Sequence, residues 1–181
     1  MFPIAIDLKK IPILLIGQGE AFEKRYKQLV DFGAAQVTLR HTDATRYPEI
    51  TAQLDTDLRR YDERIIMVAG LPYETSSQIA TSARNAGKLV NVEDVNDLCD
   101  FYFMANVKRG DLIISVSTGG ASPTLARRVR DYIAAKFGSE WAERTKEIAD
   151  FRNTLKSDGK TIPQVLKASD KFLQEKGWLN D

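Results

Sequence analysis

The sequence predicts an α/β fold built around a parallel β-sheet. Two apolar runs, at residues 11–16 and 65–69, have the length and composition of buried strands. Each run is followed by a segment in which apolar residues recur at helical spacing. This alternation of strands and helices is typical of a parallel sheet covered by helices. The turn Gly17-Gln18-Gly19 follows the first run and opens a helix, which indicates a Rossmann-like domain.

The composition limits the kind of protein. A chain of 181 residues suffices for one hydrophobic core with a small appendage, and its 43% hydrophobic and 28% charged fractions are those of a globular protein. The net charge of +1 favours neither nucleic-acid nor membrane binding. No apolar stretch approaches the ~18 residues that cross a bilayer, and the N-terminus lacks the pattern of a signal peptide, so we expect a cytoplasmic location.

Cys99 and His41 are the single cysteine and the single histidine. One cysteine excludes an intrachain disulfide, and one histidine cannot build a His-rich metal site, so we expect no resident metal. Cys99 lies in an apolar run and is expected to be a small packing residue. His41 follows a strand and is expected at the surface or at the edge of a ribose site.

The first half of the chain is predicted to form successive strand–helix pairs. Residues 2–8 predict a short strand or an extended arm, and a helix should run from the glycine turn to about Phe32, with Gly33 ending it. The helical spacing at 47–64 predicts a surface helix. The predicted strands are residues 11–16, 36–40, 65–69 and 88–92, and residues 75–85 form a further predicted helix.

The second half is predicted to complete the sheet and then become helical. Residues 112–116 predict the last strand of the sheet, and helices follow at 124–137, 140–155 and 163–176, with a loose tail at 177–181. The chain then divides into a Rossmann-like dinucleotide-binding domain (1–114), a linking segment (115–139) and a small helical C-terminal domain (140–181).

The glycine turn is the predicted binding site of a dinucleotide. Gly17 suits a tight turn, and Gly19 allows the backbone to approach a pyrophosphate. Phe22 stands where a small residue normally packs the helix on the strand, so its ring must push the helix outward or lie across the cofactor groove. The expected contacts at this edge are Gly17, Gln18, Gly19, Glu20, Ala21, Ala69 and Gly70.

Two charged residues after the second strand bear on the choice of cofactor. Asp43 is a candidate partner of the ribose hydroxyls of NAD, although it falls late in the sequence. Arg40 could instead meet the 2′-phosphate of NADP. Each is equally compatible with a solvated loop charge, so NAD is predicted and NADP stays open.

A further binding region is predicted between residues 89 and 130. One strand ends in Glu93 and Asp94, and the later strand runs into the segment 117–123, of sequence STGGASP. Ser122 before a proline is an ordinary helix start, the two glycines can be a simple turn, and Asp94 can be a solvated loop acid. Together, an acid and a helix start at the carboxyl ends of parallel strands indicate a site for a charged ligand.

The motifs VNVED (90–94), DLCDFYF (97–103) and SVSTGGASPTLARRVR (115–130) resemble those of the precorrin-2 dehydrogenases. This family includes sirohydrochlorin ferrochelatases and the dehydrogenase module of siroheme synthase. The resemblance implies an NAD-dependent oxidation of precorrin-2 to sirohydrochlorin in siroheme biosynthesis, with ferrous iron inserted by some members. It also implies a homodimer in which the segment after Val116 crosses between subunits and serves as the dimerisation segment.

The resemblance also implies roles for individual residues. Asp94 matches the family's catalytic aspartate and would accept the proton, whereas strand alternation points Glu93 the other way. A tetrapyrrole with eight carboxylates needs cations and helix-start N–H groups. Ser122 matches a serine that is phosphorylatable or lines the substrate. The expected substrate contacts are Asn91, Ser117, Gly119, Gly120, Ser122 and Arg127.

The sequence departs from the family pattern at the cofactor pocket. The family usually has three consecutive glycines and then a small residue, whereas this chain has Gln18 and Phe22; Leu71 and Pro72 also replace small, hydroxyl or acidic residues. These departures motivate a second hypothesis, a non-catalytic relative that binds a tetrapyrrole or a nucleotide as a carrier or sensor. A third is a Rossmann oxidoreductase of another small anion.

Overall fold

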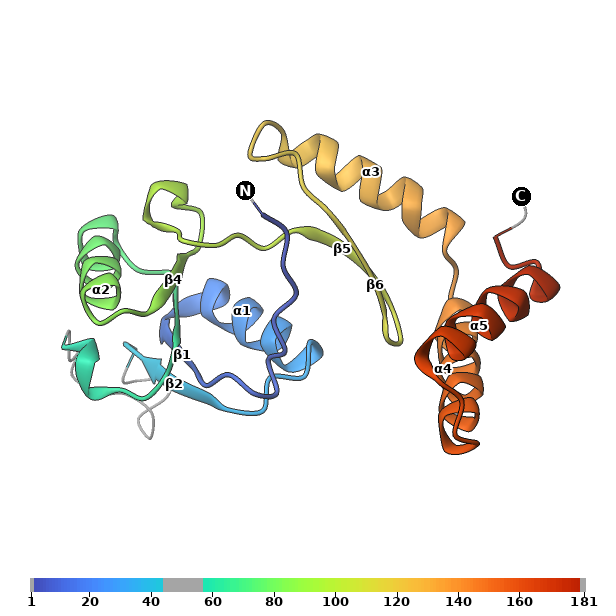
Figure 1. The fold of residues 1–181 in the computed structure, drawn as a ribbon. Coiled ribbons are helices and arrows are strands. Elements are labelled where there is room, and N and C mark those ends of the chain that lie inside the picture. The colour runs from blue at the N-terminus through green and yellow to red at the C-terminus, as the bar shows by residue number, and fades with distance from the viewer. Residues whose placement is uncertain (1, 44–56, 180–181) are drawn as a thin grey trace. The chain divides into compact units, whose positions relative to one another are not determined.

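The computed structural model describes residues 2–43 and 57–179. The chain forms two compact units, Met1–Phe103 and Met104–Asp181 (Figure 1). The predicted three-part division at 114 and 139 stays a prediction. Each unit is described by itself below.

The first unit is a four-stranded, fully parallel sheet with the strand order β2-β1-β3-β4. After β2 the chain returns to the other side of β1, so the order reverses between β1 and β3. Ligands of open α/β sheets bind at such a point, beyond the carboxyl ends of the strands. The elements are β1 (Ile13–Gly17), α1 (Gly19–Asp31), β2 (Val37–His41), η1 (Leu58–Arg60), β3 (Ile65–Ala69), α2 (Tyr73–Asn85), β4 (Leu89–Val92) and η2 (Asn96–Leu98).

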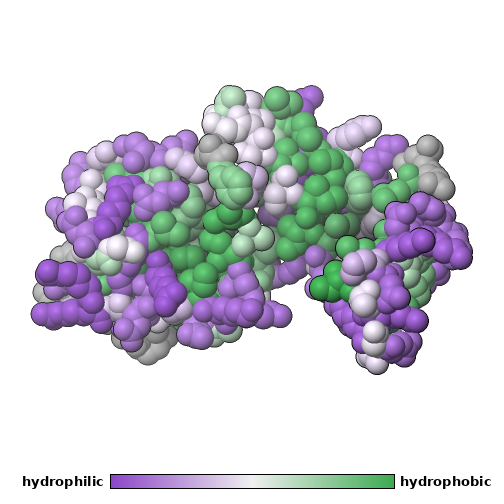
Figure 2. Space-filling view, in the orientation of Figure 1, coloured by the Kyte–Doolittle hydropathy of each residue, from purple (hydrophilic) through white to green (hydrophobic). Residues whose placement is uncertain are grey.

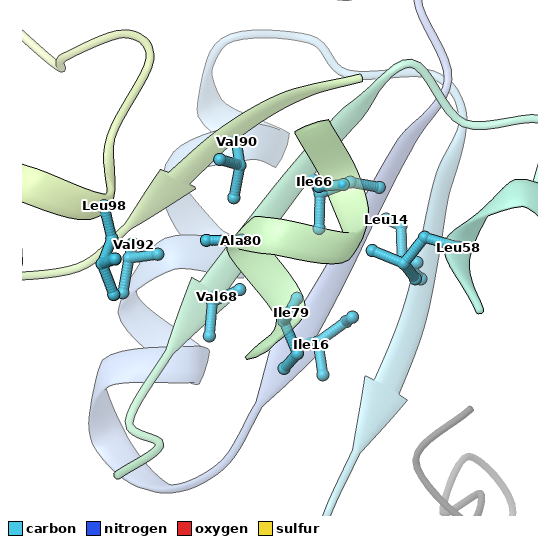
Figure 3. Packing of buried hydrophobic residues seen from close by; sticks show 11 residues of the cluster. Leu14, Ile16, Leu58, Ile66, Val68, Ile79, Ala80, Val90, Val92 and Leu98 are labelled. Carbon is cyan, nitrogen blue, oxygen red and sulfur yellow. The ribbon is translucent and has the colours of Figure 1, made fainter. Parts of the chain in front are cut away.

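The central strands β1 and β3 are buried on both faces, which explains their uninterrupted apolar sequences. Successive side chains alternate between the faces. One face packs against α2 and η1, where Ile16, Val68 and Ile79 belong to one cluster (Figure 3). The other face packs against α1, where Leu15 and Met67 belong to a second cluster.

Phe22 lies in the cluster between α1 and the sheet, with only 1% of its surface exposed. Its ring edge meets the imidazole of His41 at a centroid distance of 4.8 Å. The ring is therefore a core side chain. The expectation that His41 lies at the surface was wrong: His41 is fully buried, because Phe22 covers its ring and its Nδ1 accepts a hydrogen bond from Asp43 N.

The second unit begins with an antiparallel hairpin, β5 (Ala105–Arg109) and β6 (Leu112–Val116), which forms its own two-stranded sheet. The expectation that residues 112–116 complete the parallel sheet was therefore wrong. The physical reason is the two-residue connection Gly110-Asp111, because only antiparallel strands can be joined so tightly. Gly110 has φ +60°, as the first position of such a turn requires.

Three helices follow the hairpin: α3 (Pro123–Lys136), α4 (Trp141–Ser157) and α5 (Ile162–Lys176). In α4 and α5 the rings of Phe151 and Phe172 stack at 4.6 Å. The tail was expected to be loose, but Trp178 packs edge-on against Phe172 at 5.8 Å. Gly177, in the left-handed conformation, ends α5 and turns the chain before Trp178.

Of the two alternatives for residues 2–8, a strand or an arm, the structure has the arm: these residues contain no strand, and Ile6 and Leu8 pack against the cluster beside α1. Most of the helix predicted at 47–64 lies outside the described residues, and between 57 and 64 only the short η1 is helical, with Leu58 fully buried. Within the described part of the chain, no helix is long and apolar enough to span a membrane.

The burial of Phe22 predicts a large loss of stability on truncation. We expect Phe22→Ala to lower the free energy of unfolding by about 3–5 kcal/mol, because it removes a buried ring and leaves a cavity beside the sheet. Val30→Ala on the same helix, where the side chain is exposed, should cost less than about 1 kcal/mol. Urea unfolding followed by circular dichroism would measure both. Equal losses would show that Phe22 does not lie in the core.

Candidate active site

The carboxyl ends of β1 and β3 approach each other at two glycines. A Cβ at Gly17 would lie 1.9 Å from the carbonyl oxygen of Ala69, and a Cβ at Gly70 would lie 2.2 Å from that of Gln18. Gln18 N also donates to Ala69 O at 3.1 Å. Any larger residue at Gly17 or Gly70 would force the strand ends apart, so these glycines set the shape of the turn between β1 and α1.

The start of α1 is open to a ligand. Gly19 has φ +68°, and apart from its chain neighbours and the backbone of α1, no atom of the described residues lies within 4 Å of the position that a Cβ would take there. Gln18 is the N-cap residue, but its side chain makes no capping hydrogen bond. The first-turn N–H groups and the positive end of the helix are therefore available to an anion such as a phosphate. Glu20 and Ala21 form the next part of this turn.

The end of β2 is tied to the same turn. Thr42 N donates to Gly17 O at 3.0 Å, and Thr42 Oγ1 donates to Gln18 Oε1 at 2.8 Å. The guanidinium of Arg40 lies 5.8 Å from the centre of the Tyr61 ring, and its Nη1 donates to Leu39 O. The structure thus brings the predicted cofactor contacts of β1, β2 and β3 to one edge of the sheet. Thr42 was not among the predicted residues.

Asp94 follows β4 at the same edge. It is exposed and has φ +60°, and among the described residues it is the one non-glycine residue with a positive φ. Aspartate tolerates this left-handed conformation better than most residues, but it still stores strain of about 1–3 kcal/mol. Such strain clusters at functional positions. The side chain of Glu93 turns instead toward Arg25 of α1, as strand alternation predicts.

Two residues near Asp94 have structural roles. Asn91 is buried, and its Nδ2 donates to Phe101 O at 2.9 Å. Its side-chain amide therefore fixes the start of the aromatic segment 101–103. The Sγ of Cys99 accepts from Val92 N at 3.2 Å and lies 3.3 Å from Val95 O. Burial raises the pKa of the Cys99 thiol, which keeps it protonated at neutral pH. Cys99 therefore supports the turn and is not an activated nucleophile.

The predicted substrate contacts after β6 belong to the second unit. Ser122 is the N-cap of α3, and its Oγ accepts from Leu125 N at 3.1 Å. Thr118 Oγ1 accepts from Ser122 N at 3.0 Å, which closes the turn that contains Gly119 and Gly120. Both glycines are exposed with positive φ. The other two predicted contacts, Ser117 and Arg127, are also exposed.

The predicted site residues therefore divide between the two units. The cofactor contacts, Asn91 and Asp94 belong to the first unit, and the set from Ser117 to Arg127 belongs to the second. Sequence reasoning missed Arg25, because an arginine on an amphipathic helix looks like a surface residue. Its burial depends on Phe103, which lies far along the chain.

Two family models match the chain. One, described as "Putative NAD(P)-binding", covers residues 4–105. The other, described as "Sirohaem biosynthesis protein central", covers residues 109–136. The first match contains the glycine turn and Asp94, and the second contains β6 and all of α3.

Curated relatives of similar sequence are siroheme synthases. That of Methylococcus capsulatus is 33% identical over 162 residues, which is 85% of this chain and 34% of the relative. That of Klebsiella pneumoniae is 28% identical over 163 residues, which is 86% of this chain and 35% of the relative. The chain therefore spans about a third of the length of these relatives.

A solved structure with a similar fold is that of SirC, a precorrin-2 dehydrogenase. The TM-score is 0.73 at 17% sequence identity, over 99% of this chain and 92% of that one. This similarity confirms the predicted Rossmann-like α/β fold and shows that the fold continues through the helical C-terminal part.

Proposed function

The chain belongs to the siroheme-biosynthesis family that carries the putative NAD(P)-binding region, and from this premise we propose that it oxidises precorrin-2 to sirohydrochlorin with NAD as electron acceptor. The observation that supports this proposal best is the position of Asp94. It is an exposed acid on a strained turn, at the same sheet edge as the open glycine turn before α1.

The residues of the first unit fit a dinucleotide. Gly17 and Gly70 leave room for no side chain, and the space above Gly19 is open. The N-terminus of α1 would hold the pyrophosphate, and Thr42 or Asp43 at the end of β2 would lie toward the ribose. Bound NAD would supply the hydride acceptor. Phe22 departs from the family pattern at the cofactor pocket, but its ring is buried in the core and does not block the glycine turn.

Oxidation of the tetrapyrrole removes two hydrogens, one as a hydride and one as a proton. Asp94 is proposed to accept the proton, because its carboxylate is exposed and its backbone position is fixed. The substrate carboxylates would be met by the N–H groups at the start of α3 and by Arg127. Asn91, Ser117 and Ser122 are further proposed substrate contacts, and their side chains also make hydrogen bonds within their own units.

A second activity, insertion of ferrous iron into sirohydrochlorin, is proposed for the same carboxylate. Metal insertion displaces protons from pyrrole nitrogens, and Asp94 could receive one. Iron would be a substrate of this lyase reaction, and the described residues contain no group of three or more His, Cys, Asp or Glu that could hold a metal. The cytoplasm is the proposed location.

We also propose that the chain forms a homodimer through the hairpin and α3. A two-stranded sheet is marginal by itself in water. Ile113 of β6 and a stripe of Leu125, Val129 and Tyr132 on α3 are exposed, and Figure 2 shows hydrophobic residues gathered over these elements. Covering such a surface with a second copy would bury apolar area that the isolated unit leaves in water.

Replacement of Asp94 tests the proposed reaction. We expect Asp94→Asn to lower kcat for precorrin-2 oxidation about 10²–10⁴-fold, because the proton acceptor is lost. Asparagine also tolerates a positive φ, so the fold and the affinity for NAD should be kept. The measurement is the rate of NADH formation together with NAD binding by calorimetry. Wild-type protein that binds NAD but never turns over precorrin-2 would support the carrier or sensor hypothesis instead.

Two glycines with nearly the same φ, Gly19 and Gly87, allow a matched test of the cofactor site. Gly19 and Gly87 have φ +68° and +70°, and beyond the local backbone no atom in the described part of the chain lies within 4 Å of either Cβ position. We expect Gly19→Ala and Gly87→Ala to lose similar stability, about 1–2 kcal/mol. Only Gly19→Ala should weaken NAD binding, by about tenfold or more. Equal NAD affinity in both variants would place the dinucleotide elsewhere.

The homodimer proposal predicts a change of oligomeric state. Tyr132→Asp places a charge in the apolar stripe and should shift the protein to a monomer in analytical ultracentrifugation. Arg127→Asp, exposed on the opposite face of the same helix, should leave the dimer unchanged. A wild-type monomer at micromolar concentration would refute the proposal.

A further inference from the structure

The turn that presents Asp94 is fixed by contacts on both sides of that residue. Glu93 N donates to Val68 O at 2.9 Å, which extends the pairing of β4 with β3 up to the turn. On the other side, the thiol of Cys99 lies within hydrogen-bond distance of Val95 O. A left-handed aspartate persists only when its surroundings hold it, so these contacts and the side chains around them determine where the carboxylate lies.

The side chain of Glu93 is almost completely enclosed beneath the turn. It is 11% exposed, and its Oε1 lies 3.9 Å from Arg25 Nη2 and 4.0 Å from Lys24 Nζ. Its Oε2 is buried without a hydrogen-bond partner among the described residues. A buried carboxylate with one unsatisfied oxygen is costly, so its position depends strongly on the cation beside it.

Arg25 is that cation. Its side chain is also 11% exposed, whereas that of Lys24 is 83% exposed and solvated. The guanidinium lies 4.0 Å from the centre of the Phe103 ring, and Nη1 donates to Gln28 Oε1 at 3.0 Å. Burial lowers the pKa of Arg25, and the charges of Glu93 and Asp94 oppose that shift. Arg25 therefore pairs with Glu93 while its guanidinium lies over the Phe103 ring.

From this arrangement we infer that Arg25 is a positioning residue for Asp94. Clamped between Phe103 and Glu93, it anchors Glu93 beneath the turn and so fixes the direction in which the neighbouring Asp94 projects. The inference rests on the proposed dehydrogenase function, since it assigns Arg25 a part in placing the proton acceptor. Arg25 acts through Glu93 and is not itself a catalytic residue.

The position of Arg25 on α1 connects the Asp94 turn with the proposed cofactor site. Arg25 lies on α1, the helix whose first turn would hold the pyrophosphate. The same helix would therefore hold the dinucleotide at its start, and it carries Arg25 less than two turns later. One helix would thus contribute to the placement of both the cofactor and the proton acceptor, and hydride transfer depends on the relative positions of the two.

The test compares Arg25→Met with Lys24→Met, which removes the other cation near Glu93. We expect Arg25→Met to lower kcat about tenfold to hundredfold with the KM for NAD unchanged, because the acid is displaced while the cofactor turn is intact. Lys24→Met should keep the wild-type kcat and KM. Arg25→Lys, which keeps the charge but loses the planar contact with Phe103, should fall between them and guards against misfolding of the methionine variant.

A second readout separates positioning from turnover. In two-dimensional NMR spectra of the NAD-saturated protein, the Asp94 amide resonance should move in both Arg25 variants and stay in place in Lys24→Met. If wild-type protein does not oxidise precorrin-2, the proposed function fails, and the NMR comparison alone decides the positioning role. An unmoved Asp94 resonance in folded Arg25 variants would overturn the inference, as would an equal effect of Lys24→Met.

Discussion

The structure of the first unit depends on one close backbone approach. At the point where the strand order reverses, the ends of β1 and β3 meet with Gly17 against Ala69 O and Gly70 against Gln18 O, and no Cβ fits on either side. This approach starts α1 next to the sheet edge and leaves its first turn open. The register of the four strands then brings Arg40, Asp43 and Asp94 to the same edge. The site is thus a consequence of sheet topology and two missing side chains.

The residues near the Asp94 turn have two different roles: Asp94 has a strained backbone, and its neighbours stabilise the turn. Asp94 is exposed and has an unfavourable backbone conformation, whereas the nearby Asn91 is buried and hydrogen-bonded. Asn91 holds the aromatic segment, Cys99 holds the turn, and Arg25 lies between Glu93 and the ring of Phe103. Of these three residues only Asn91 is a predicted substrate contact, and its hydrogen bond to Phe101 O shows that its amide also has a structural role.

How much could be predicted from the sequence varies with the range of the interactions. The strand at residues 65–69, the glycine turn and the Ser122 cap follow from local patterns, and the structure has each of them. The pairing of residues 112–116 was mispredicted, although the short Gly110-Asp111 turn carried the needed information. The burial of His41 and Arg25 could not be predicted, because each depends on an aromatic ring brought close by the fold. The substrate roles of Gly119, Gly120 and Arg127 remain predictions.

The packing of Trp178 against the aromatic cluster of α4 and α5 has a practical consequence. The chain contains two tryptophans, and both, Trp141 and Trp178, lie in the second unit, with ring centroids 6.5 Å apart. Tryptophan fluorescence therefore reports on the unfolding of the helical C-terminal part, which contains both indole rings. Circular dichroism averages over the whole backbone. A difference between the two denaturation curves would reveal that the units lose their structure in separate steps.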